Sequence, residues 1–462
     1  MDARPTPGPS TGMGKVAAAG IAASVAEWLD FFIYTTASAL VFGKLFFPEF
    51  SDSAGTILSF GTLAVGFIAR PIGGILAGHL GDKHGRRPVL VGAMVLMGIA
   101  TLGVGLLPTF ETIGIAAPII LVTLRCIQGL GVGAQWGGAA LLLTEHSPIG
   151  RRGFYGSLVQ LGAVTGSALA TGIFYLLAVL MSESAFESWG WRIPFLGGIL
   201  VVAVGLYIQR RIEDTPVFQE LQAKTAEAPQ AAPRKRPVIE VLRTHPAAVA
   251  QAAGAFLVVN AAFYVLSTGM VDFGSRVVGM SRGTTLGIVL GAGLTQLISM
   301  PLFGWLSDKP GVRRRPLFLI GSVGLAIWVY PMFLLVETGT PALVFLALAV
   351  AFTIHSMMYG PQAAMYAEMF PSDLRFSGAS LGYQVASVLA GGLAPIIMTS
   401  LLAVAGSWSV ALYLVGMAAL TFLAVYTIHE SFRRSFRTGD GGTGDTAPAG
   451  AYAAPIAERS HR

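Results

Sequence analysis

The chain has 462 residues, of which 54% are hydrophobic and only 12% are charged, and its mean hydropathy is +0.68. This composition excludes a soluble globular protein and indicates a protein that resides in a lipid bilayer. The net charge of +6 includes the basic run 234–236, which a loop close to anionic lipid explains better than a nucleic-acid site. The single cysteine, Cys126, excludes internal disulfides and cysteine-based metal sites.

Apolar runs long enough to cross a bilayer, which takes about 20 residues, occur twelve times along the chain. In the first half they cover residues 16–42, 54–80, 88–108, 113–143, 153–181 and 190–210. In the second half they cover residues 245–271, 284–306, 316–336, 340–367, 376–404 and 409–429. The predicted fold class is an all-α membrane protein with twelve transmembrane helices in two pseudo-symmetric six-helix bundles.

The segments outside these runs complete the predicted domain organisation. Residues 212–243 are rich in Ala, Pro, Gln and charge, which is typical of a linker, and the end of the chain lacks apolar heptads. We therefore predict a disordered segment 1–14, a first bundle 15–211, a cytoplasmic linker 212–243, a second bundle 244–430 and a mostly disordered tail 431–462.

The distribution of Lys and Arg predicts the orientation of the chain. Of 30 such residues, 24 fall on one side, and the exceptions are Lys44, Arg70, Arg125, Arg192, Arg276 and Arg282. Because basic residues concentrate on cytoplasmic loops, both termini are predicted to be cytoplasmic, in a multi-pass protein of the inner (plasma) membrane. Glu27 and Asp30 in the first span argue against a cleaved signal sequence.

Two pairs of loops repeat along the chain at nearly the same offset. GDKHGRRP at 81–88 returns as SDKPGVRRRP at 307–316, which aligns Asp82 with Asp308. A second set keeps its internal spacing at almost the same shift, so that Glu145, Pro148 and Arg152 correspond to Glu368, Pro371 and Arg375. Repeated membrane halves of this kind predict a binding site between the halves, near the bilayer midplane.

The charged residues of these loops are predicted to form a clasp that holds the cytoplasmic side closed. The alternative is that the basic turns only fix the topology. The predicted gating residues are Asp82, Arg86, Arg87, Glu145, Arg152, Asp308, Arg313, Glu368 and Arg375.

Charges inside the spans carry most of the functional information, because a charge near the midplane costs at least about 2.5 to 3.5 kcal/mol unless it is paired or hydrated. Glu27 and Asp30 are three residues apart and share a helix face. Two neighbouring carboxylates in a low dielectric resist ionising together, which favours a proton carrier. The alternative is a structural salt bridge with Arg70 or Arg125.

Both of these arginines lie among regularly spaced glycines, Gly66, Gly74 and Gly78 around Arg70 and Gly129, Gly133 and Gly137 after Arg125. Such stripes of small residues predict close helix packing, not a nucleotide site. Arg70 is interpreted either as a counter-ion to the acids or as a group that grips a substrate carboxylate. His355, in the tenth span, is either a hydrogen-bonded buried histidine or a second proton candidate.

Polar side chains in otherwise apolar helices are predicted to converge on a substrate pocket between the halves. Those of the first half are Tyr34, Arg70, Gln128, Gln135 and Gln160, and those of the second half are Tyr264, Tyr383 and Gln384.

Seven segments together resemble the major facilitator superfamily and, within it, the metabolite:proton symporters that carry citrate, 2-oxoglutarate, shikimate and proline or betaine. They are EWLDFFIY (27–34), ARPIGG (69–74), GHLGDKHGRR (78–87), RCIQGLGVGAQWGGA (125–139), RRGFYGS (151–157), EDTPVF (213–218) and AEMFPSDLRFSGASLGY (367–383). The resemblance implies a carrier that alternates between inward-open and outward-open states and uses the proton gradient to import a small organic solute. Proton coupling would fall on Glu27 and Asp30, with Arg125 tuning them.

This resemblance implies a small-molecule substrate, a proton and the lipid bilayer as partners, with no cofactor, no metal and no enzymatic activity, in a monomer. Gln135 stands where many relatives would carry an acid, and the tail lacks the coiled-coil pattern of osmosensing betaine carriers. An efflux antiporter or uncoupled facilitator is the alternative function, and a membrane enzyme or sensor is a more distant one. Two arginines favour a carboxylate substrate, whereas the acids would equally receive the ammonium of a zwitterion.

Overall fold

The computed structural model describes residues 13–84, 86–133, 140, 143–144, 147–211, 237–370 and 374–429. Most of the predicted N-terminal segment and of the linker, and the whole of the predicted tail, therefore lie outside the described residues. Met13 and Gly14 already belong to the first helix, and helix α13 begins at Pro237, within the predicted linker.

In the first half, the described residues form helices that match the predicted spans. The elements are α1 (Met13–Ala37), η1 (Ser38–Phe42), α2 (Gly43–Phe46), α3 (Asp52–His84), α4 (Arg86–Leu106), α5 (Phe110–Ile113), α6 (Ala116–Val132), η2 (Ile149–Arg151), α8 (Arg152–Leu180), α9 (Glu183–Ser188), η3 (Gly190–Arg192), α10 (Ile193–Leu196) and α11 (Gly198–Arg211).

The second half repeats this arrangement. Its elements are α13 (Pro237–Thr244), α14 (Pro246–Tyr264), η4 (Val265–Gly269), α15 (Met270–Asp272), η5 (Phe273–Val277), α16 (Arg282–Leu294), α17 (Gln296–Ser307), α18 (Arg314–Glu337), α19 (Pro341–Met369), α20 (Arg375–Ala386), η6 (Ser387–Gly392), α21 (Ala394–Ala405) and α22 (Ser407–Tyr426). The π-helical turns η1 and η4 begin at Ser38 and Val265, which are related by nearly the same shift as Asp82 and Asp308. The internal repeat therefore extends to the backbone.

Within the described part of the chain, nine helical stretches are long and apolar enough to cross a membrane, and three further apolar helices are shorter. The shorter ones, Val91–Leu106, Ala116–Val132 and Gly190–Ala203, fall in three of the predicted spans. Large apolar side chains such as Leu180 and Ile298 are more than three-quarters exposed, as expected for lipid-facing surfaces. The prediction of an all-α protein with twelve membrane helices is confirmed.

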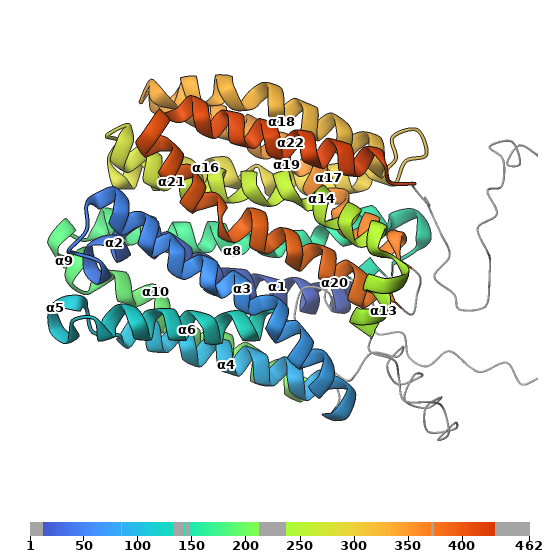
Figure 1. Cartoon of the computed structure of the whole chain (residues 1–462), viewed down its shortest axis with the longest axis horizontal. Coiled ribbons are helices and arrows are strands. Elements are labelled where there is room, and N and C mark those ends of the chain that lie inside the picture. Colours follow the sequence, from blue (N-terminus) through green and yellow to red (C-terminus); the bar gives the residue numbers. More distant parts are fainter. Residues whose placement is uncertain are drawn as a thin grey trace, which may run out of the picture.

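The helices lie side by side, with α1, α3, α4 and α6 on one side of the molecule and α18, α19 and α22 on the other (Figure 1). Between them, α8 of the first half packs against α16, α17 and α19 of the second, and α3 packs against η6 and α21. The interface between the halves therefore runs along α8 on one flank and along α3 on the other.

Helices α3 and α6 approach each other through the two predicted glycine stripes. A Cβ atom added at Gly129 would lie 2.2 Å from the Gly66 carbonyl oxygen, and one at Gly133 would lie 2.0 Å from that of Arg70. Real Cβ atoms do not come so close, so the backbones pack in direct contact only because these positions are glycine. The packing role predicted for Gly66, Gly74, Gly129 and Gly133 is confirmed. Gly137 and the contacts of Gly78 lie outside what the structure describes.

The first basic turn is shorter than predicted. Helix α3 continues to His84 and α4 begins at Arg86, whereas the second copy forms a turn between Ser307, the last residue of α17, and Arg314. A helix does not end where its apolar run ends, because polar residues such as Asp82 remain compatible with helical backbone. Asp82 therefore belongs to α3.

Candidate functional site

Asp30 is 1% exposed and lies in a hydrogen-bonded group that we call the Asp30 network, consisting of Asp30, Thr101, Gln128 and Arg125. The Thr101 hydroxyl donates to Asp30 Oδ1, and the Gln128 amide donates to Thr101 Oγ1 over 2.8 Å. The Arg125 guanidinium donates to Gln128 Oε1 over 3.1 Å. Because Arg125 can only donate, it fixes the orientation of the Gln128 amide, with its NH₂ group toward Thr101 and Asp30.

Arg125 and Arg70 lie against aromatic rings of the first half. The Arg125 guanidinium carbon is 4.3 Å from the Tyr34 ring centroid, and that of Arg70 is 4.2 Å from the Phe67 centroid. Each is also 4.8 Å from the centroid of Phe31, whose ring both arginines share. Aromatic faces stabilise a buried cation without neutralising its charge, so both arginines keep the capacity to bind an anion.

Glu27 is 7% exposed and lies one helical turn from Asp30 on α1. Arg70 and Asp30 are the charged groups that act on it electrostatically. Among the described residues, no ion pair within 4 Å joins Glu27 or Asp30 to Arg70 or Arg125. The structure therefore does not contain the salt bridge considered as an alternative for these acids.

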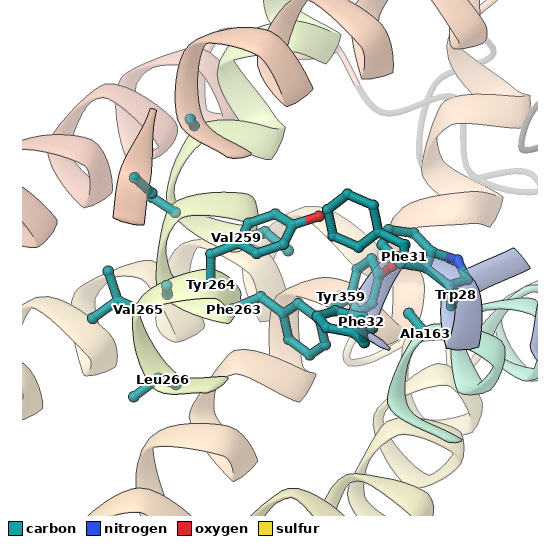
Figure 2. Packing of buried hydrophobic residues seen from close by; sticks show 14 of the residues in the cluster. Trp28, Phe31, Phe32, Ala163, Val259, Phe263, Tyr264, Val265, Leu266 and Tyr359 are labelled. Atoms are coloured by element: carbon teal, nitrogen blue, oxygen red, sulfur yellow. The ribbon is translucent and has the colours of Figure 1, made fainter. Parts of the chain in front are cut away.

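Aromatic side chains from both halves meet beside these charges. Phe31 and Phe32 of α1 face Phe263 and Tyr264 of α14, as Figure 2 shows. The Tyr264 ring also meets Phe67 edge to face, with a centroid distance of 5.7 Å. The buried Tyr264 hydroxyl has no hydrogen-bond partner among the described residues. Such an orphaned donor at the interface is a candidate contact for a polar substrate.

Amide side chains also meet across the interface between the halves. Gln160 Nε2 donates to Gln362 Oε1 over 3.4 Å, and Gln384 Nε2 approaches the Gly133 carbonyl oxygen at 3.5 Å. Gln384 Oε1 and Gln362 Nε2 are buried without a partner among the described residues. Tyr383 stacks on Phe256 within the second half, at a centroid distance of 4.4 Å.

His355 is fully buried and both of its ring nitrogens have partners. Gln296 Nε2 lies 2.9 Å from Nδ1, and the Val259 carbonyl oxygen lies 3.0 Å from Nε2. Since the Gln296 amide NH₂ only donates and a carbonyl only accepts, these contacts select the neutral tautomer with its hydrogen on Nε2. The geometry is that of a hydrogen-bonded buried histidine.

Four residues form a group at the end of the molecule that carries the second basic turn. We call this group the Asp308 cluster, and its members are Arg152, Asp308, Arg314 and Glu368. Asp308 accepts hydrogen bonds from the backbone N–H groups of Gly153 and Phe154, 2.8 and 2.9 Å away. Its carboxylate thereby caps the N-terminus of α8, which belongs to the other half, and gains from the helix dipole.

Ion pairs join the members of this cluster, and one of them, between Arg152 and Glu368, crosses the interface between the halves. Arg314 lies 3.2 Å from both Asp308 and Glu368, and Arg152 of the first half lies 3.6 Å from Glu368. Arg375 is buried nearby and acts electrostatically on Arg152. Arg313, which the sequence suggested for this role, lies at the exposed N-cap of α18 with a φ of 58°. The guanidinium that contacts both carboxylates belongs to the next residue, Arg314.

A second, more exposed group of ion pairs joins the halves at the opposite end. Arg282 at the start of α16 lies 3.6 Å from Glu183 and 3.7 Å from Glu187, both in α9. Glu187 also pairs with Lys44 at 2.9 Å. Exposed pairs contribute at most about 1 kcal/mol each, so these pairs stabilise the contact between the halves only weakly.

The structure assembles the predicted residues into separate groups. Gln128 and Tyr34 belong to the interior of the first half, because the Tyr34 hydroxyl lies 2.6 Å from Thr62 of α3. Gln135 and Glu145 lie outside the described residues, and only the helical backbone of Asp82, Arg86 and Arg87 is described.

The residues of these groups that were not predicted include Thr101, Gln362 and Arg314. Gln362 interrupts an apolar helix, which was an available signal, and Arg314 is the middle residue of the run 313–315. Thr101 had no signal, because threonine is common in apolar helices, where its hydroxyl bonds to its own backbone.

Comparisons with known proteins agree with this architecture. Residues 20–395 match the family model of the Major Facilitator Superfamily. The chain is 38% identical to the shikimate transporter of Escherichia coli (strain K12), covering 91% of this chain and 95% of the relative. It is 32% identical to the proline/betaine transporter of the same strain, covering 92% and 85%.

The fold is also similar to a solved structure of the proton:xylose symporter XylE, with a TM-score of 0.68, 21% identity, and coverage of 89% of this chain and 95% of that one. At this identity the likeness concerns the fold alone. The family resemblance predicted from the motifs is confirmed, and it identifies a multi-pass membrane transporter and not an enzyme. The chain belongs to the Major Facilitator Superfamily.

Proposed function

We propose that the protein is a proton-coupled secondary transporter that imports a small carboxylate-bearing metabolite by alternating access. The observation that carries the proposal is the burial of two acids and two arginines in one bundle, with no ion pair between them in the described part of the chain. With both acids ionised this group is formally neutral, and with one acid protonated its charge is +1. A bound carboxylate then restores neutrality.

This charge balance provides the coupling. Protonation of Asp30 or Glu27 favours binding of an anion, and by reciprocity a bound anion favours protonation. Arg125 tunes the acids through the Asp30 network. Proton and carboxylate therefore enter together and leave together, which is symport.

The proposed substrate pocket lies beside the aromatic contact between the halves. Arg70 would hold the carboxylate through paired hydrogen bonds. Tyr264 and Gln384 each carry a buried polar atom without a partner among the described residues, and these atoms would bind further polar groups of the substrate. Similarity to a shikimate transporter supports this class, because shikimate is a carboxylate, whereas similarity to a proline/betaine transporter keeps a zwitterion as the alternative.

The proposed gates are the inter-half contacts at the two ends. The Asp308 cluster, with Arg375, would close the cytoplasmic end, and Asp82, Arg86, Arg87 and Glu145 would contribute the corresponding first-half residues. We place both termini in the cytoplasm and the protein in the inner membrane as a monomer, with bundles 15–211 and 244–430 joined by the linker 212–243.

The test uses purified full-length protein in proteoliposomes. Thermal unfolding is first compared in shikimate, other organic acids, proline and betaine, since a ligand at 100 times its Kd stabilises by about 2.7 kcal/mol. Uptake of the stabilising compound is then measured with the outside acidic, with equal pH, and with the outside alkaline. Symport predicts accumulation only with the outside acidic. Equal uptake without accumulation would indicate a facilitator, and accumulation under the opposite gradient would indicate an antiporter.

A further inference from the structure

In the Asp30 network, two acceptors compete for the single hydroxyl hydrogen of Thr101. Its side chain is fully buried on α4, and its Oγ1 atom contacts Asp30 Oδ1 and, at 2.9 Å, the Met97 carbonyl oxygen of its own helix. Both partners are acceptors when Asp30 is ionised, but a hydroxyl has one hydrogen to donate. Only one of the two bonds can form at a time.

The protonation state of Asp30 decides which bond forms. When Asp30 is ionised, its charge makes it the stronger acceptor and the Thr101 hydrogen points to it. When Asp30 is protonated, its own O–H donates to Thr101 Oγ1, and the Thr101 hydrogen turns to the Met97 carbonyl. In both states Thr101 also accepts from Gln128 Nε2, so this hydrogen bond is kept when Asp30 gains or loses its proton.

We propose that Thr101 is a positioning residue for proton coupling, a hydroxyl that reorients when Asp30 gains or loses its proton and that passes this change to Gln128 and Arg125. The inference rests on the proposed role of Asp30 as a coupling acid. No proton is lost or gained by Thr101 itself: one proton from water binds to the Asp30 carboxylate, and the hydroxyl hydrogen only changes its acceptor. Gln128 and Arg125 follow because the three side chains form one continuous chain of hydrogen bonds.

The other groups around Asp30 do not offer this function. Glu27 on the same helix, Arg125 on α6 and Arg70 on α3 are charged and would change the electrostatic balance without reorienting a hydrogen. Helix α8, which packs along α1, carries no titratable side chain between Tyr155 and Tyr175. Gln128 Nε2 also lies 3.5 Å from Asp30 Oδ2, but an amide NH₂ group only donates. Thr101 is therefore the neutral group that can reverse the direction of its hydrogen bond when the state of Asp30 changes.

The test measures protonation of Asp30 directly, without a substrate. Infrared difference spectra of the purified full-length protein are recorded between pH 4 and 10, and the carboxylic C=O band of Asp30 is identified as the band that Asp30→Asn removes. In Thr101→Val both states lose a hydrogen bond, but the ionised state loses the stronger, charge-assisted one. The pH midpoint of the band is therefore expected to rise by about one unit, a tenfold change in proton affinity.

Matched variants separate this role from a structural one. Thr101→Ser keeps the hydroxyl and is expected to restore the midpoint to within about 0.3 units. Thr35→Val removes a buried hydroxyl of α1 that donates to the Phe31 carbonyl oxygen, and it should leave the midpoint unchanged. If valine at position 101 prevents folding, Thr101→Ala also removes the hydroxyl and gives the same comparison.

Two negative results have different meanings. A normal Asp30 band whose midpoint is the same in the wild type, Thr101→Val and Thr101→Ala would overturn the role of Thr101 and leave the coupling proposal intact. A wild-type protein with no Asp30 band that titrates in this range would overturn both.

Discussion

In the described part of the first half, the interior contains two acids and two arginines that form no ion pair with one another, whereas in the second half the corresponding buried groups have partners. Asp272 pairs with Arg276 at 2.9 Å, and His355 is held neutral by Gln296 and the Val259 carbonyl. The same shift that carries Asp82 to Asp308 carries Arg70 to Gln296, so a charge in one half corresponds to an amide in the other. The two halves share a backbone plan but not their chemistry.

This difference indicates how proton coupling and substrate recognition are divided between the two halves. A buried charge whose partner is fixed contributes to the fold, while a buried charge without one is available to a proton or an anion. The first half would thus carry coupling and charge recognition, and the second half would supply aromatic walls and hydrogen-bonding groups that move relative to them. The following experiments exchange or remove groups on each side of this comparison.

The largest effect is expected for Asp30→Asn. The amide keeps the shape of the side chain but cannot carry a proton, so accumulation driven by a pH gradient should be lost while counterflow exchange of substrate continues. Uptake into proteoliposomes measures both. The matched control is Asp272→Asn in the second half, which should retain gradient-driven accumulation. A variant at Asp30 that still concentrates substrate like the parent would transfer the coupling role to Glu27.

Arg70→Gln places in the first half the residue type that the second half has at the equivalent position. Loss of a charge-assisted, paired hydrogen bond to a carboxylate costs about 1.5 to 3 kcal/mol, which predicts about 10- to 100-fold weaker substrate binding. Isothermal titration calorimetry on purified protein checks this, with Arg70→Lys as the variant that keeps the charge without the planar fork. Unchanged affinity in Arg70→Gln would show that Arg70 serves only as a counter-ion.

Asp308→Asn tests the second basic turn. Removing one partner from a buried ion-pair cluster costs about 3 to 5 kcal/mol, and this cost falls on the state in which Asp308 caps α8. A cost of this size shifts the populations of the two states by more than about 100-fold. Transport is therefore expected to fall at least about tenfold, whereas binding to the state that stays populated should change by less than about threefold. Equal losses of both quantities would mean that the turn supports the fold and does not act as a gate.

The same substitution in the first copy, Asp82→Asn, shows how far the two turns are equivalent. We expect a decrease in transport relative to binding with the same sign as for Asp308→Asn. Parallel measurement of uptake and binding for both variants shows whether the two turns are equivalent. Transport unaffected by Asp82→Asn would confine the gate to the second copy.

The smallest effect is expected for His355→Gln. The amide nitrogen of glutamine can replace the bond to the Val259 carbonyl, and a histidine held neutral by two partners carries no coupling proton. Gradient-driven accumulation should stay within about twofold of the parent, while thermal stability decreases by up to about 2 kcal/mol through the imperfect hydrogen bonds. Loss of accumulation with unchanged binding would instead make His355 part of the proton path.

Much of the fold was predictable because its signals are local. Apolar length predicts each span, and the spacing of Gly66 and Gly129 predicts the close approach of α3 and α6. The repeat also placed Asp308 and Glu368 in one predicted group of gating residues. These features depend on composition and spacing, which are present in a single sequence.

The details of the site were less predictable, because they depend on how helices rotate against each other. The sequence could not show that Arg314 and not Arg313 enters the Asp308 cluster, since a change of one position rotates a helical side chain by about 100°. Nor could it show that Thr101, an ordinary residue of an apolar helix, faces Asp30. Orientation around a helix axis is set by packing, not by local composition.

The glycine contact between α3 and α6 has one further consequence. With no side chain between their backbones, α3 and α6 pack in direct contact, which favours movement of the two helices as one unit. Arg70 and Arg125, one on each helix, would thus belong to one rigid unit and keep a fixed separation. During a transport cycle the distance between the two positive charges would remain constant. A substrate would be selected partly by whether the distance between its anionic and polar groups matches the distance between the two guanidinium groups.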